Sequence, residues 1–308
     1  MAKTVLLAVA SGVASALLAG LHGVPSGIFL AFLAPLPLLI VGLGSGPGAA
    51  AVAVGCGLVL FAVFGGGLFA AGLYGGTHAI PSWLLVHQSL LRRPAPDGSV
   101  EWSSAGSVVS VLAVFGAIVI CGYASIWSPG IEGNVREALG GMVGAMTQAQ
   151  VDTPLARIAD ILVPLLFGSA GAMWVMVLTV NGVIAQGLLA RGGNNVRPTP
   201  RWSRLTLPNW LSWLLIGTAA LALVTGGDLG YLARNAFVVL ATPYFFLGLA
   251  VVHDLCRRLS IPGIVLVVFY VLLIWLLAVV GPMVAGIGVL EHWVGIRRRF
   301  GAPDQESE

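Results

Sequence analysis

The sequence predicts an all-α protein, a polytopic transmembrane helix bundle of about eight to ten helices. Hydrophobic residues make up 58% of the 308 residues and charged residues only 9%, whereas a soluble domain carries about 25% charged residues. Apolar runs long enough to cross a bilayer recur along the chain, and most arginines lie in the breaks between them. We therefore expect one integral membrane domain over residues 1–300 and a polar tail over residues 301–308.

The predicted spans follow the apolar runs in order. They cover residues 5–21, 28–43, 47–64, 68–91, 105–126, 158–185, 209–224 and 235–255, with a final stretch over 261–296. That stretch is too long for one ordinary span. Gly281 and Pro282 are expected to divide it, because proline lacks the N–H that a helix interior needs. A short turn at residues 225–228 is expected to lead into the eighth span.

Two of the runs are expected to be broken helices. Pro35 and Pro37 interrupt the second run, and glycines followed by Pro81 interrupt the fourth near residues 75–81. Each proline removes a backbone donor and disfavours a regular helix before it. A carbonyl freed at membrane depth must face protein or water, and transporters use such breaks to hold substrates. The alternative is a packing kink without a binding role.

Residues 128–157 are expected to form an amphipathic helix that lies along the membrane surface or caps the bundle. Its apolar positions at helical spacing are Ile131, Val135, Leu139, Met142 and Met146. Glu132 and Glu137 fall on other faces of that helix.

Arginine clusters predict the topology, because such clusters mark the cytoplasmic side. They are Arg92 and Arg93; Arg191, Arg197, Arg201 and Arg204; Arg257 and Arg258; and Arg297, Arg298 and Arg299. With a cytoplasmic N-terminus, spans four, six and eight end at a cluster, but a single final crossing would leave the last cluster outside. Either the final stretch crosses twice or an earlier run does not cross. We prefer a cytoplasmic C-terminus, in the inner membrane of a bacterium.

Polar residues in or beside the spans are the candidate ligand-binding residues, because their burial in lipid is costly. Asp228, Arg234 and Asn235 bracket the outer entrance of the eighth span. They would form the mouth of a pocket for an anionic group, or Asp228 and Arg234 would pair and hold the turn. His78 lies in the glycine-rich break, where it would contact a ligand or relay protons, or else cap the broken helix.

The sequence contains no motif for catalysis, nucleotide binding or metal binding. Cys56, Cys121 and Cys256 lie in or beside apolar runs, and we expect them to be packing residues rather than disulfide or metal partners. We expect no enzyme activity, no cofactor and no metal site. Nucleic-acid binding is not expected either, because no aromatic stacking platform accompanies the arginines.

Several short segments resemble one family of membrane proteins. The segments are residues 34–37, 228–235, 243–253 and 288–293. They resemble the YybS-like family of uncharacterised bacterial membrane proteins over nearly the whole chain. Members of that family look distantly similar to the substrate-binding S-components of energy-coupling-factor vitamin transporters. The resemblance implies a small-solute or lipid ligand, and it supplies no catalytic residues.

Three functions follow from these observations. The leading hypothesis is a solute- or lipid-handling protein of S-component character, whose cavity lies between the two broken runs and the eighth span and whose energising ATPase is another chain. Its candidate binding residues are Pro35, Pro37, His78, Asp228, Arg234 and Asn235. The alternative is an assembly or scaffold protein that binds a membrane-protein partner through small-residue helix faces such as that from Gly12 to Gly20, and through the amphipathic helix. A lipid-modifying enzyme is the weakest of the three.

Overall fold

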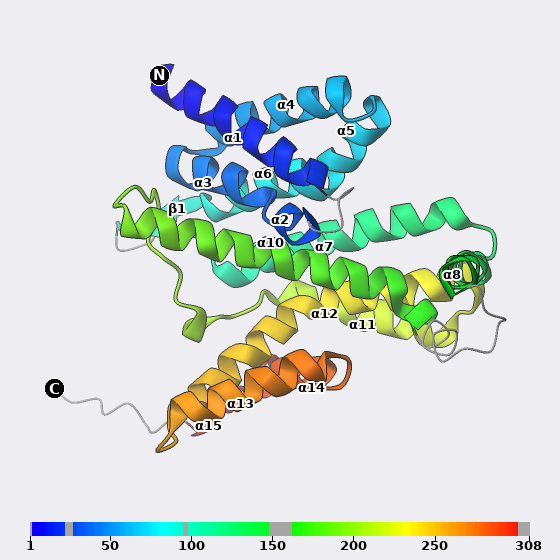
Figure 1. Cartoon of the computed structure of the whole chain (residues 1–308). Helices are drawn as coiled ribbons and strands as arrows, with labels where there is room; N and C mark the ends of the chain where they lie inside the picture. Colours follow the sequence, from blue (N-terminus) through cyan, green and yellow to red (C-terminus); the bar gives the residue numbers. More distant parts are fainter. Residues whose placement is uncertain (1, 22–26, 95–97, 148–161, 301–308) are drawn as a thin grey trace. The chain divides into compact units, whose positions relative to one another are not determined.

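A computed structural model describes residues 2–21, 27–94, 98–147 and 162–300 (Figure 1). Most of these residues are helical. Within these ranges the only strands are β1 (Arg92–Pro94) and β2 (Val100–Trp102), which form an antiparallel hairpin. The predicted all-α class is therefore confirmed.

The chain divides into two compact units. Unit 1 comprises residues 1–115 and 174–200, and unit 2 comprises residues 116–173 and 201–308. Two long helices, α7 (Ala105–Ala124) and α10 (Leu166–Arg191), contribute residues to both. Each unit also has its own clusters of buried apolar side chains.

Unit 1 gathers the N-terminal helices around α4. Its N-terminal elements are α1 (Ala2–Gly20), α2 (Ile28–Ala31), α3 (Pro35–Ser45), α4 (Pro47–Phe64), α5 (Leu68–Tyr74), the π-helix η3 (Gly75–Ala79) and α6 (Ile80–Ser89). Both α1 and α3 pack along α4. A Cβ added at Gly12 of α1 would collide with the Ala53 carbonyl of α4. Small residues permit such close approach, so α4 already covers α1 around Gly12, whereas Gly20 at the end of the small-residue face remains exposed.

Unit 2 is built around the long helix α12. Its elements are η4 (Ser125–Trp127), α8 (Ile131–Thr147), η5 (Val163–Leu165), η6 (Trp202–Arg204), α11 (Asn209–Val224), α12 (Gly227–Cys256), α13 (Pro262–Trp275), α14 (Leu277–Val294) and α15 (Ile296–Phe300). Helices α11 and α14 pack along α12.

The contact between α12 and α14 is reciprocal. A Cβ at Gly248 would collide with the Val284 carbonyl, and a Cβ at Gly288 would collide with the Tyr244 carbonyl. Gly248 therefore faces Val284, which lies one helical turn before Gly288, and Gly288 faces Tyr244, which lies one turn before Gly248. This is the arrangement in which Cα–H groups approach carbonyl oxygens at tight membrane-helix crossings.

Six helices of the described chain are long and apolar enough to span a membrane. They cover Ala2–Gly20, Pro47–Phe64, Ala105–Trp127, Val163–Arg191, Gly227–Cys256 and Leu277–Val294. Three shorter apolar helices cover Phe29–Ser45, Asn209–Val224 and Pro262–Trp275. The chain is thus a multi-pass membrane protein. The broken second run accounts for the first of the shorter helices.

Three predicted boundaries were wrong. The sixth span ends at Arg191 rather than at residue 185. The final stretch is divided at Leu276, which leaves the helical region with φ −118° and ψ 34°, and Pro282 lies inside α14 instead. A proline costs a helix one hydrogen bond without ending it where neighbouring helices pack over it, and α14 packs along α12. The eighth span begins at Gly227 rather than 235, because Asp228 is an acidic residue that favours the first turn of a helix.

The C-terminal arginine cluster lies beside the basic loop that precedes α11. Arg297 donates from its two terminal nitrogens to the carbonyl oxygens of Ser203 (2.6 Å) and Leu205 (2.8 Å). Its Nε donates to Glu291 Oε1 at 2.8 Å. These contacts put Arg297 at the same end of unit 2 as the loop that carries Arg201 and Arg204.

Candidate functional site

The first turn of α8 is held by a carboxylate of α12. Asp228 accepts hydrogen bonds from Ser128 Oγ (2.7 Å), from the Gly130 N–H (3.1 Å) and from the Ile131 N–H (2.8 Å). The N–H groups at the start of a helix have no partner within it, and an acidic group there also favours the helix dipole. Asp228 therefore fixes the position of α8 from a distance of about a hundred residues along the chain.

Arg234 makes the second link between these helices. Its NH2 donates to Glu132 Oε2 at 2.9 Å, and its guanidinium carbon lies 5.9 Å from the centre of the Tyr231 ring. The predicted Asp228–Arg234 pair was therefore wrong. Both residues bind groups at the start of α8 instead. Asp228 accepts from backbone N–H groups that have no partner within the helix, and Arg234 pairs with the Glu132 carboxylate.

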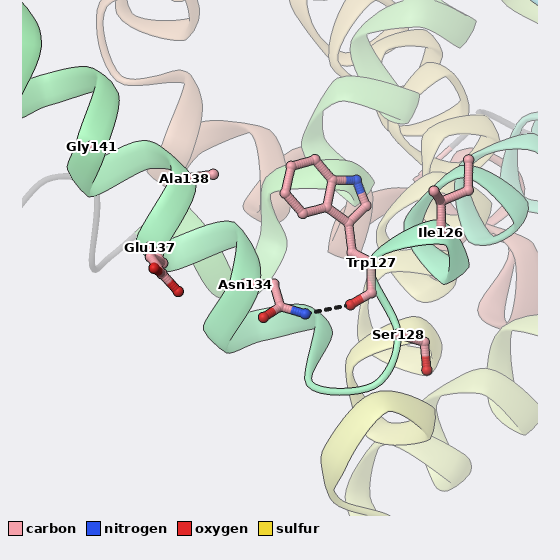
Figure 2. Close-up of a pocket in the computed structure, with 7 residues that line it drawn as sticks. All are labelled: Ile126, Trp127, Ser128, Asn134, Glu137, Ala138 and Gly141. Atoms are coloured by element: carbon pink, nitrogen blue, oxygen red, sulfur yellow. Dashed lines mark hydrogen bonds between the residues drawn. The ribbon is translucent and has the colours of Figure 1, made fainter.

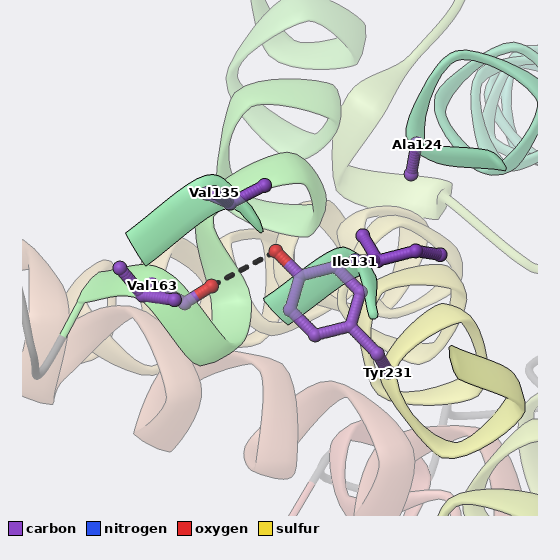
Figure 3. Packing of buried hydrophobic residues seen from close by; sticks show 5 residues of the cluster. All are labelled: Ala124, Ile131, Val135, Val163 and Tyr231. Atoms are coloured by element: carbon purple, nitrogen blue, oxygen red, sulfur yellow. Dashed lines mark hydrogen bonds between the residues drawn. The ribbon is translucent and has the colours of Figure 1, made fainter. Parts of the chain in front are cut away.

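Asn235 and Tyr231 join α12 to the start of α10. Asn235 is fully buried; its Oδ1 accepts from the Gly168 N–H at 2.6 Å, and its Nδ2 donates to the Pro164 carbonyl at 3.1 Å. The Tyr231 hydroxyl donates to the Val163 carbonyl at 2.9 Å (Figure 3). The Tyr231 ring lies in a buried cluster with Ala124, Ile131, Val135 and Val163. These contacts give Asn235 a structural role at this junction.

An open pocket lies between η4 and α8 (Figure 2). Its volume is about 750 Å³ and its lining residues are Ile126, Trp127, Ser128, Asn134, Glu137, Ala138 and Gly141. The Asn134 amide donates to the carbonyls of Trp127 (2.6 Å) and Pro129 (2.9 Å), which fixes the pocket wall to the residues before α8. Ser128 also donates to Asp228, so the pocket adjoins the junction just described.

The amphipathic character predicted for residues 128–157 is present in the part of α8 whose side chains are described. Ile131 and Val135 are buried, whereas Arg136 and Glu137 are exposed. Helix α8 runs to Thr147. The predicted continuation over residues 148–157 and the side chains of Met142 and Met146 lie outside the described part of the chain.

The break at Pro35 is bridged by α10. Helix α2 ends at Ala31 and α3 begins at Pro35, so the predicted interruption is present. Asn181 Nδ2 donates to the Phe32 carbonyl in the break at 2.9 Å. Pro35 is buried in the first turn of α3 and Pro37 is half-buried there. A side chain of the protein thus satisfies a carbonyl that the break frees.

The second break is a π-helical turn and is also bridged by α10. Trp174 Nε1 donates to the Thr77 carbonyl at 2.7 Å, and Thr77 Oγ1 lies 2.6 Å from His78 Nδ1. The His78 ring stacks on Tyr74 with centroids 5.7 Å apart. Turns of this type often occur at functional sites.

Packing brings the two breaks together inside unit 1. Ala34 beside the first break and Tyr74 and Ala79 around the second belong to one buried cluster. The six candidate residues therefore form two groups: Pro35, Pro37 and His78 in unit 1, and Asp228, Arg234 and Asn235 in unit 2.

One protein family covers most of the chain. The sequence matches the family described as predicted membrane protein (DUF2232) over residues 13–291. The chain belongs to this family. No curated protein and no solved structure matches it. All six candidate residues and the whole α8 pocket lie within the DUF2232 region.

Sequence reasoning missed the polar lining of the pocket in this DUF2232 protein. Glu137 was expected only as a residue off the apolar face of a surface helix, Asn134 was given no role, and Trp127 precedes the predicted segment over residues 128–157. Asn134 and Glu137 follow one another at helical spacing with Ala138 and Gly141, and this small and polar face is the signal that could have identified them. Among the residues that the structure describes, no group of three metal-binding side chains occurs.

Proposed function

We propose that this protein binds a lipid or a small solute at the α8 pocket and takes part in its transport, with the character of an S-component. The pocket is the observation that carries the proposal, because ligand sites occupy about 300–1,000 Å³ and this one measures about 750 Å³. The protein would lie in a bacterial inner membrane with both termini in the cytoplasm. An ATPase on another chain would supply the energy.

The lining favours a ligand that donates hydrogen bonds. Both amide hydrogens of Asn134 and the hydroxyl hydrogen of Ser128 are already used. The Glu137 carboxylate takes part in no hydrogen bond or ion pair within the described ranges, so the wall offers acceptors. Ile126 and the Trp127 ring supply apolar surface beside them, and the Trp127 indole N–H adds one hydrogen-bond donor to the wall. An amphiphile with a hydroxyl or ammonium head matches that combination.

Native mass spectrometry of the gently purified protein tests the proposal. We expect a small molecule or lipid at fixed stoichiometry on the natural protein. Ala138→Trp fills the pocket and should remove it. Gly140→Trp is the matched control, because Gly140 lies on the same helix, faces open space and does not line the pocket; it should keep the ligand.

Other outcomes would contradict the proposal. A bare chain from its own membrane would end it, and so would a ligand that both variants retain. A chain that carries only another protein would favour the scaffold alternative. That alternative cannot use the face of α1 around Gly12, which α4 already covers.

A further inference from the structure

Arg197 is a buried cation in the loop after α10. Its exposed fraction is only 6%. Its NH1 donates to the Ser89 carbonyl at 2.7 Å, whereas its Nε is buried and has no acceptor in the described part of the chain. None of the ion pairs found there includes Arg197. A full positive charge is thus enclosed with one neutral carbonyl as its partner.

The backbone around Arg197 is fixed. Its carbonyl accepts from Gln186 Nε2 at 2.9 Å and from Asn195 Nδ2 at 2.8 Å. Gln186 is itself buried. Two side chains therefore hold the main chain of Arg197, and its guanidinium is held by the bond to the Ser89 carbonyl.

Burial of a charge without a counter-charge is unfavourable, and such charges are normally paired in proteins. Ser89 ends α6, and a helix C-terminus offers only about half a negative charge. Burial also lowers the pKa of the Arg197 guanidinium from its ordinary value. An anion is therefore the group that this position lacks. The planar fork of arginine fits the oxygens of a phosphate, which it can bind through two parallel hydrogen bonds.

The surroundings of Ser89 place this position at the polar edge of an apolar region. Arg92 follows Ser89 by three residues, so it lies within about 11 Å along the chain. Arg92 is exposed and pairs across the β hairpin with the half-buried Trp102. Arginine and tryptophan beside the ends of apolar helices are typical of the headgroup zone of a bilayer.

We propose that Arg197 binds a phosphate group at the membrane surface. The phosphate would bridge the Arg197 guanidinium and the Arg92 side chain. An anionic lipid headgroup and free inorganic phosphate both offer this chemistry.

Thermal unfolding of the full chain in dodecyl maltoside, a detergent without phosphate, distinguishes these sources. The added probes are short-chain phosphatidylglycerol, the matching diacylglycerol without phosphate, and inorganic phosphate. We expect phosphatidylglycerol to raise the unfolding temperature of the natural protein and diacylglycerol to leave it unchanged. A shift with inorganic phosphate alone would identify free phosphate as the ligand.

Variants locate the effect. Arg197→Gln should abolish the phosphatidylglycerol shift, and Arg93→Gln, an exposed position opposite Glu101, should retain it. Arg197→Lys keeps the charge but not the fork, so it should need about tenfold more lipid for half the shift. If Arg197→Gln does not fold, Arg197→Lys decides. An equal shift in Arg197→Lys and the natural protein, or no shift with either phosphate source, would overturn the proposal.

Discussion

Arg197 in unit 1 and Arg297 in unit 2 both belong to basic clusters that follow apolar helices, and both donate to main-chain carbonyls. Arg297 also has a carboxylate partner, Glu291, and each of its three guanidinium nitrogens has an acceptor. Arg197 is more deeply buried, yet within the described ranges of the chain it has one acceptor and no carboxylate. The difference separates an arginine that is satisfied within the chain from one that requires a partner outside it.

The largest effect is expected at the satisfied arginine. Arg297→Met leaves the Glu291 carboxylate, which is 8% exposed, without its cation. Breaking a buried pair from one side costs about 3–5 kcal/mol. Thermal unfolding in detergent should show a large drop for Arg297→Met and a smaller one for Arg297→Met with Glu291→Gln, since the double variant leaves no charge behind. Equal drops would mean that Arg297 acts through its carbonyl contacts alone.

The next largest effect concerns the close packing of α14, the helix that carries Glu291, against α12. Gly288→Ala adds a Cβ against the Tyr244 carbonyl, and overpacking of this kind costs about 1–3 kcal/mol. Gly286→Ala is the control on the same helix, because Gly286 faces open space. A lower unfolding temperature for Gly288→Ala alone is expected. No difference between the two variants would contradict the close crossing.

Asp228 offers the mirror case, a carboxylate that is satisfied without a cation. Its oxygens accept from one hydroxyl and two backbone N–H groups. Asp228→Asn replaces one acceptor by a donor that faces these same donors, so we expect a loss of about 1–2 kcal/mol. The protease sensitivity of α8 should rise with it. Glu137→Gln on the exposed face of α8 is the control and should change neither quantity.

The smallest effect is expected at the unsatisfied arginine. In phosphate-free detergent Arg197→Met removes one hydrogen bond, which destabilises the protein. It also removes an unpaired buried charge, which stabilises the protein. The two changes oppose each other, so the unfolding free energy should alter by less than about 1 kcal/mol. A loss as large as that of Arg297→Met would show that Arg197 is already satisfied, and would remove the contrast between the two residues.

Much of the fold follows from local sequence signals. The predicted span over residues 47–64 coincides with α4, because Pro47 starts the helix and three glycines follow its end. The span over 209–224 likewise coincides with α11. Leu276 carries no such signal, and nothing in the local sequence explains why the helix is interrupted there. Pro35 correctly predicted the break in the second run, whereas Pro282 wrongly predicted a break in the final stretch.

The candidate site was predictable only in part. Sequence position identified Asp228, Arg234 and Asn235 as polar residues that need partners, but their partners are some seventy to a hundred residues away. The spacing within residues 228–235 suggested a pair between Asp228 and Arg234. It could not reveal Glu132, because Glu132 lies about a hundred residues away in the sequence. The same limit hid Arg197, since basic loop residues are ordinarily exposed and only the packed α6 and α10 enclose this one.

The crossing of Gly248 and Gly288 has a consequence for how the protein is made. Helices enter the bilayer in the order of translation, so α12 is inserted while α13 and α14 are still inside the ribosome. Until α14 arrives, the surface of α12 around Gly248 lacks the contact with Val284 that covers it in the folded protein. Unit 2 therefore completes its packing only after α14 has been made.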